Sequence, residues 1–446
     1  KTVVVDATTV TLGRCGGTVA LASGASQTGF GRTGTVDWIT TPKTATFTAV
    51  SGEGYFCNTS GGAFTVNLPA SPSAGDIVAL KDYNGNFATA NLTIGRNGSN
   101  LDGNAGDKVI STNFQNFTIV YVDSTQGWIT TGSGTGNIGV EPAFITATGG
   151  TETTCGDYKI HTFTGPGALC VSNAGNAAGS NAVDYLVVAG GGGGGRGNSA
   201  SNYSAGGGGG GGYRESPGTA SGSYTVSPLG VSPAVALPVS VQPYTVTVGG
   251  AGAAAPSAAS RGSNGTNSTF SSITSTAGGG GGRGGSPYPG TGPGINGNPG
   301  GSGGGAGISG TPGSGNTPSV TPSQGSNGGG GGGANNSGGG GGGATAVGAN
   351  ANQPANSGGP GGAGATSSIN GTPTARAGGG GGASGNGISA GGSGGGGAGG
   401  TGAPGGNAPG VAGSTNTGGG GGAGSNDSST AAAGGSGIVI IRYKFQ

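Results

Sequence analysis

Uninterrupted runs of glycine punctuate the second half of this chain, and they restrict its fold more than any other feature. Glycine accounts for 120 of the 446 residues, and the runs lie at 190–195, 206–212, 278–282, 303–305, 328–333, 338–343, 378–382, 394–397 and 418–422. Glycine has no side chain to bury in a core, and it loses more conformational freedom on folding than any other residue. This half of the chain therefore cannot be an ordinary helical or α/β domain.

Charge and hydrophobicity exclude further classes of protein. Only 7% of the residues are charged and the net charge is +1. Nucleic-acid binding relies on Lys and Arg that neutralise phosphates, so we expect no nucleic-acid partner. No apolar run reaches the roughly 18 residues that a membrane span requires, so we expect no membrane insertion. The chain begins at Lys1 and contains no methionine, from which we expect that residues precede Lys1 in the translated protein.

Strand patterns dominate the chain outside the glycine runs. Phe64, Val66 and Leu68 alternate with polar residues, which is typical of a half-buried strand. The segments 157–163 and 168–172 flank the sequence TGPG and predict a β-hairpin. The chain closes with GIVIIRYKF, a further strand. We therefore expect an all-β fold with essentially no α-helix outside the glycine runs.

These patterns divide the chain into six segments. We expect an N-terminal strand and connector at 1–35, a small all-β module at 36–134 and a linker at 135–142. A β-hairpin and strand segment at 143–189, a glycine-rich domain with surface loops at 190–437 and a closing strand at 438–446 follow.

The glycine runs have two physical interpretations. Flexible low-complexity sequence is the usual meaning of such a composition. A flexible linker, however, needs no pure glycine runs, and it would not end in an apolar strand. Polyproline II helices have three residues per turn and no internal hydrogen bonds, so all-glycine helices of this kind can pack together by bonding to their neighbours. The second interpretation predicts a non-globular bundle or sandwich of polyglycine II helices.

Several sequences around the runs resemble a known family. VDYLVVAGGGGGG at 183–195, YTVTVGGAG at 244–252 and GGSGIVIIRYKF at 434–445 look like the C-terminal glycine-rich domain of tailed-bacteriophage tail-fibre proteins. Residues 41–83 resemble the β module that precedes this domain in such fibres. The resemblance implies a polyglycine II sandwich whose loops determine which bacterium is bound.

The resemblance also implies a location and partners. We expect a distal tail-fibre segment of the virion that binds a bacterial surface glycan or outer-membrane protein and contacts other tail proteins. A homotrimer is expected because the fibre-like module shares one polypeptide with the glycine domain. A purely structural extracellular filament without a receptor is the alternative, and a flat ice-binding face is a third, which the irregular loops disfavour.

Individual residues give few chemical signals. Tyr and Arg residues in or beside the segments between runs are candidates for receptor contacts, because Tyr offers a flat apolar face with a polar tip; these are Tyr203, Tyr213, Arg214, Arg283, Tyr288 and Arg376. The alternative is that they only cover the edges of the glycine domain. His161 is the sole histidine and is expected to be structural. We expect no enzyme activity, cofactor or metal site.

The four cysteines leave their pairing open. Cys155 and Cys170 flank the expected hairpin, and a disulfide between them would stabilise the fold by roughly 3 kcal/mol. Free thiols are the alternative, because virions assemble in a reducing cytoplasm. The spacing of Cys15 and Cys57 decides nothing.

Overall fold

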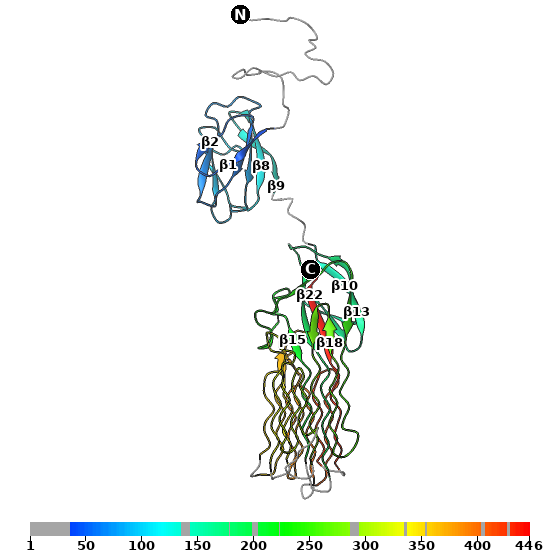
Figure 1. Cartoon of the computed structure of the whole chain (residues 1–446). Coiled ribbons are helices and arrows are strands. Elements are labelled where there is room, and N and C mark those ends of the chain that lie inside the picture. The colour runs from blue at the N-terminus through cyan, green and yellow to red at the C-terminus, as the bar shows by residue number, and fades with distance from the viewer. Residues whose placement is uncertain are drawn as a thin grey trace, which may run out of the picture. The chain divides into compact units, whose positions relative to one another are not determined.

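The computed structural model describes residues 36–134, 143–177, 179–198, 204–222, 224–285, 294–333, 337–352, 355–402, 406–425 and 429–446. The chain divides into two compact units, Lys1–Gly139 and Val140–Gln446. Across the described ranges the secondary structure consists of β-strands in several sheets, without a helix (Figure 1). The expected N-terminal strand and connector at 1–35 and the expected linker at 135–142 lie outside the described residues.

The first unit consists of two sheets that share one hydrophobic core. The five-stranded sheet has the order β1-β3-β5-β8-β9, and the four-stranded sheet has the order β2-β4-β6-β7. The strands are β1 (Asp37–Lys43), β2 (Phe47–Thr48), β3 (Glu53–Cys57), β4 (Phe64–Asn67), β5 (Ile77–Asp82), β6 (Leu92–Gly95), β7 (Lys108–Ile110), β8 (Asn116–Asp123) and β9 (Gly127–Gly134). The chain thus alternates between the sheets from β1 to β6.

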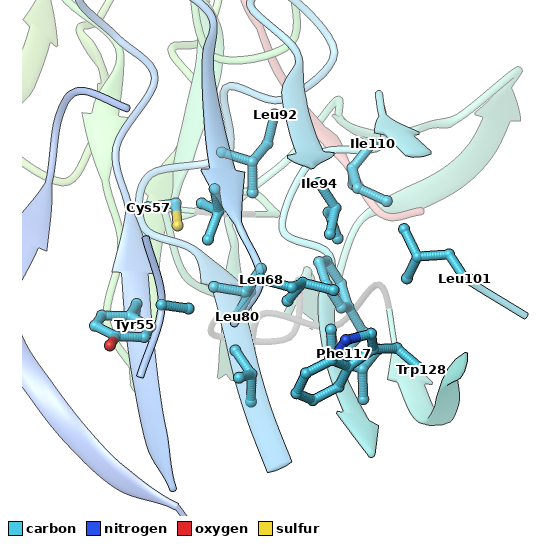
Figure 2. Packing of buried hydrophobic residues seen from close by; sticks show 14 of the residues in the cluster. Tyr55, Cys57, Leu68, Leu80, Leu92, Ile94, Leu101, Ile110, Phe117 and Trp128 are labelled. Carbon is cyan, nitrogen blue, oxygen red and sulfur yellow. The ribbon is translucent and has the colours of Figure 1, made fainter. Parts of the chain in front are cut away.

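Side-chain alternation explains how the two sheets meet. Phe64, Val66 and Leu68 are buried and the residues between them are not, as the alternating pattern predicts. Leu80 and Trp128 of the five-stranded sheet lie in the same cluster (Figure 2). The core of the first unit is therefore formed by the facing sides of two sheets.

The second unit contains two larger sheets. One has the order β10-β13-β17-β18-β19, and the other has the order β11-β12-β22-β14-β15. Their strands are β10 (Ile145–Thr148), β11 (Thr151–Cys155), β12 (Tyr158–Phe163), β13 (Gly167–Ala174), β14 (Ala182–Val188), β15 (Tyr213–Glu215), β17 (Pro243–Thr247), β18 (Ser268–Phe270), β19 (Ile273–Ser275) and β22 (Ile438–Lys444). The short strand β16 (Leu237–Pro238) pairs with β14, and β20 (Ala365–Ser367) pairs with β21 (Thr374–Arg376).

The predicted hairpin between 157–163 and 168–172 is wrong. β12 pairs with β11 and β22, whereas β13 pairs with β10 and β17, so the two strands belong to different sheets. The tight turn at Gly156–Asp157 instead joins β11 to β12. The TGPG sequence carries the chain from one sheet to the other.

The closing strand β22 lies in the middle of its sheet. It pairs antiparallel with β12 on one side and with β14 on the other. Six of its seven residues are buried. Because β14 leads into the first glycine run and β22 follows the last returning segment, one sheet holds both ends of the glycine region.

The glycine region consists of long extended segments that leave the sheets and return to them (Figure 1). The run at 190–195 leaves β14, and the run at 206–212 returns to β15. We call the end of each segment beside the sheets the sheet end and the opposite end the far end. Runs that follow a strand lead toward the far end, and runs that precede a strand lead back.

Candidate functional site: the glycine region and its far end

Each residue of the first glycine run bonds to one of three neighbouring segments in turn. The N–H groups of Gly190 and Gly193 donate to Thr266 and Ser263, at 3.1 and 2.9 Å. The N–H groups of Gly191 and Gly194 donate to the segment 432–435. Those of Gly192 and Gly195 donate to the segment 206–209. The bonds therefore repeat every three residues and point in three directions.

The second and seventh runs follow the same rule. In 206–212 successive N–H groups donate to 276–282, 339–342 and 418–421. In 378–382 they donate to 394–397, 359–362 and 208. Buried backbone groups require partners, and these segments find them in their neighbours rather than within themselves.

The spacing between segments leaves no room for side chains. A Cβ added at Gly208 would lie 2.1 Å from the carbonyl oxygen of Gly192, and one at Gly331 would lie 1.9 Å from that of Gly307. Gly250 differs, because the nearest atom to its added Cβ is Thr266 Oγ1 at 3.6 Å. Glycine is thus a steric requirement in the interior of the region but not at every position.

Two of the predicted contact residues are buried at the sheet end. Tyr213 on β15 has 1% of its surface exposed, and Arg376 on β21 has 4%. Neither side chain is exposed for a receptor contact, and both positions agree with the alternative that these residues cover the edge of the glycine domain. Tyr213 follows the returning run 206–212, and Arg376 precedes the run 378–382, which leaves β21, so both residues lie at the sheet end of the glycine region.

A buried polar network surrounds Tyr213. Its hydroxyl donates to Glu215 Oε2 at 3.0 Å, Ser227 N donates to the same oxygen at 3.0 Å, and the Ser367 hydroxyl donates to Oε1. Burial raises the pKa of Glu215, although these hydrogen bonds oppose the shift. Burial lowers the pKa of Arg376, and the nearby Tyr213 and Glu215 oppose that change. The network anchors β15 to the strand β20.

The other predicted contact residues have different positions. Arg214 lies on β15 and is half-buried. Arg283 follows an outgoing run and lies at the far end, where its Nη1 donates to the Gly284 carbonyl at 3.1 Å. Tyr203 and Tyr288 lie outside the described residues.

Sequence reasoning missed two arginines that share the far end with Arg283. Arg261 Nε donates to the Gly294 carbonyl at 3.4 Å, and the backbone N–H of Arg283 donates to the same oxygen at 2.8 Å. Arg196 N donates to Ser260 O at 2.9 Å, which places it beside Arg261. The direction of each run was the available signal, since the residue after an outgoing run must lie at the far end.

His161 on β12 and Arg442 on β22 have structural positions in the sheet β11-β12-β22-β14-β15. The His161 ring is buried, with Nδ1 at 2.7 Å from Gly149 O and Nε2 at 3.0 Å from the Tyr443 hydroxyl. This agrees with the expected structural role. The Arg442 guanidinium lies 4.4 Å from the ring centroid of Tyr158 and donates to Ile369 O.

The structure has Cys155 and Cys170 as free, exposed thiols, so the expected disulfide between them is absent. The reason is topological, because Cys155 lies on β11 and Cys170 on β13, which belong to different sheets. Cys57 is a free thiol buried in the core of the first unit, and burial raises its pKa to about 12. Cys15 lies outside the described residues.

A metal-binding cluster and a membrane-spanning helix are both absent from the part of the chain that the structure describes. No group of three or more His, Cys, Asp or Glu residues there could hold a metal ion. The same residues include no helix with the length and apolar character of a membrane span.

Comparison with known proteins places this chain in one family. Residues 171–444, more than half of the chain, match the glycine-rich domain family, and the chain belongs to that family. No curated protein matches the chain.

Proposed function

We propose that the glycine runs form a polyglycine II assembly. Such helices have three residues per turn, a rise of about 3.1 Å per residue and no internal hydrogen bonds. The three-residue cycle of bonds from Gly190 to Gly195 is what this geometry requires. The lack of space for a Cβ at Gly208 supports the same assignment, because only bare backbone packs this closely.

Hydrogen bonds between segments are the main stabilising interaction in this proposal. Each contributes about 0.5–1.5 kcal/mol net, and Cα–H contacts to carbonyl oxygens add a smaller amount. The pairing of β14 with β22 joins the first and the last segment of the glycine region to one sheet. The result is a stiff scaffold whose connecting loops are the parts free to vary.

We further propose that this scaffold is a host-recognition adhesin at the distal part of a bacteriophage tail fibre. The far end of the glycine region supports this proposal. Outgoing and returning segments connect there, and Arg196, Arg261 and Arg283 lie together at that end. Binding residues are commonly placed on loops that a rigid scaffold positions. The receptor would be a bacterial surface glycan or outer-membrane protein.

The proposal extends to the rest of the virion. The first unit would join other tail-fibre and tail proteins and form a homotrimer, while the glycine region faces the host cell. No catalytic step is part of this function, since recognition depends on shape and loop contacts alone.

Competition for adsorption tests the proposal. The purified full chain should block adsorption of a phage that carries it to a susceptible strain in a saturable manner. A chain that fails to block at saturating concentration would favour the alternative function, a structural filament component without receptor binding.

A further inference from the structure

The outer face of the five-stranded sheet in the first unit carries three exposed or half-buried aromatic rings. Trp38 has 44% of its surface exposed and Tyr83 has 54%. The rings of Trp38 and Phe56 lie 4.9 Å apart, and those of Phe56 and Tyr83 lie 6.4 Å apart, measured between centroids. An aromatic row of this kind on the solvent side needs a partner to be explained, since large apolar side chains are normally buried.

Small residues continue from Trp38 across the whole sheet. Strand register aligns Trp38 with Gly54, Gly54 with Ala79, Ala79 with Thr118, and Thr118 with Gly132. Residues aligned in this way share one face of the sheet. One large aromatic residue at the edge and four small residues beside it form a trough.

The Trp38 ring lies over the backbone of the neighbouring strand. A Cβ added at Gly54 would lie 2.8 Å from Trp38 Cδ2, so a glycine at this position leaves the room that the indole occupies. At the other end of the row, a Cβ added at Gly132 would meet no atom within 4 Å. Trp38 therefore bounds the trough at one end, and no atom covers Gly132 at the other end.

The trough has the size and the polar groups of a small-ligand site. It has a volume of about 320 Å³ and is open to solvent on one side, and its lining includes Trp38, Asn116 and Thr118. Small-molecule sites commonly measure about 300–1,000 Å³ and combine apolar surface with a few polar groups. Asn116 is exposed and supplies both a donor and an acceptor, and Thr118 supplies a hydroxyl.

We propose that this trough binds a neutral hexopyranose unit of an oligosaccharide. The apolar face of a pyranose ring matches the flat indole of Trp38, and its hydroxyl groups match the amide of Asn116 and the hydroxyl of Thr118. The lining of the trough contains no lysine, arginine or carboxylate, and the amine of Lys81, which pairs with Asn116 in the sheet, donates to Phe114 O at 2.6 Å. A neutral sugar therefore fits better than a charged one.

This site is separate from the far end of the glycine region. It lies on the first unit, and it does not depend on whether the glycine loops bind a receptor. It would give the chain a carbohydrate contact with its own specificity, in addition to the proposed receptor contact.

Tryptophan fluorescence of the full chain can detect such binding. The chain has two tryptophans, and Trp128 is fully buried, so a ligand that changes the emission acts on Trp38. Cellohexaose, maltohexaose, mannohexaose and chitohexaose serve as probes, together with a microarray of neutral bacterial glycans. We expect saturable quenching by at least one of these sugars.

Three variants locate the site. Trp38→Ala removes the stacking surface, and Gly132→Phe, whose Cβ would meet no atom within 4 Å, places a large ring in the trough, so each should weaken binding at least tenfold on the microarray. Gly61→Phe is the matched control, because a Cβ there also meets no atom within 4 Å and the residue is exposed away from the trough. It should bind as the unchanged chain does, and all three should keep the same circular dichroism.

Three results would overturn the proposal. The first is a lack of binding to any probe or arrayed glycan, and the second is equal binding by Gly132→Phe and Gly61→Phe. The third is a self-associated chain whose mass in solution falls with Trp38→Ala, because the aromatic row would then be an interface between copies.

Discussion

Ile440 near the end of the chain pairs directly with Leu186, which lies just before the first glycine run, and both side chains are almost completely buried. This pairing joins two segments that the entire glycine region separates in sequence. Every outgoing and returning segment is therefore part of a loop that one sheet closes.

Ile440→Ala should destabilise the second unit by about 2–5 kcal/mol, the usual effect of removing a large buried aliphatic side chain. Chemical denaturation monitored by circular dichroism measures the change. Val347→Ala is the control, because Val347 is 63% exposed and its truncation should alter the free energy of unfolding by less than about 0.5 kcal/mol. Equal effects of the two substitutions would contradict the role of β22.

Gly208→Ala should destabilise the glycine region by about 1–3 kcal/mol or more, because the new Cβ would collide with the Gly192 carbonyl oxygen. Gly250→Ala is matched in chemistry, but its Cβ has room, so it should be neutral or stabilise by up to about 1 kcal/mol. The free energy of unfolding of each variant provides the test. Equal tolerance of the two alanines would indicate that the segments are not closely packed.

Alkaline pH should destabilise the second unit through Tyr443. Burial raises the pKa of Tyr443 from 10.0 to about 12. The unfolded chain then loses this proton at lower pH than the folded chain, so stability is full below pH 10 and falls as the pH rises toward 12. Chemical denaturation at a series of pH values measures this change, and Tyr443→Phe should show a smaller fall over the same range. An equal fall in Tyr443→Phe and in the unchanged chain would contradict the role of Tyr443.

The far-end arginines should contribute to adsorption. The triple variant Arg196→Ala, Arg261→Ala and Arg283→Ala should block phage adsorption at least threefold less well than the unchanged chain. Arg214→Ala, at the sheet end, is the control and should block normally. A triple variant that blocks as well as the unchanged chain would exclude a role for these arginines in receptor binding.

The strands were the most predictable part of the fold. Alternation in 64–68 and the apolar run at 438–441 identify strands because apolar residues occupy the positions that are buried on one or both faces. Strand partners were not predictable in the same way. The prediction of a β12–β13 hairpin was wrong because pairing depends on which distant strands are available. β22, from the end of the chain, pairs with one edge of β12.

The candidate site was predicted only in outline. Tyr213 and Arg376 are candidates in the sequence because they lie in or beside the segments between runs, but that position does not distinguish the two ends of the region. The direction of each run does, since 190–195 follows a strand and 206–212 precedes one. Applying this rule along the chain would have selected Arg196 and excluded Tyr213.

Hydrogen exchange of the glycine amides tests directly whether the glycine segments are hydrogen-bonded to one another. The N–H groups of Gly192, Gly208 and Gly380 donate to neighbouring segments at 2.9, 2.9 and 2.8 Å. Their exchange, measured by mass spectrometry on the full chain, should be slower than in an unstructured peptide by several orders of magnitude. Exchange at the rate of an unstructured peptide would contradict the hydrogen-bonded assembly of glycine segments.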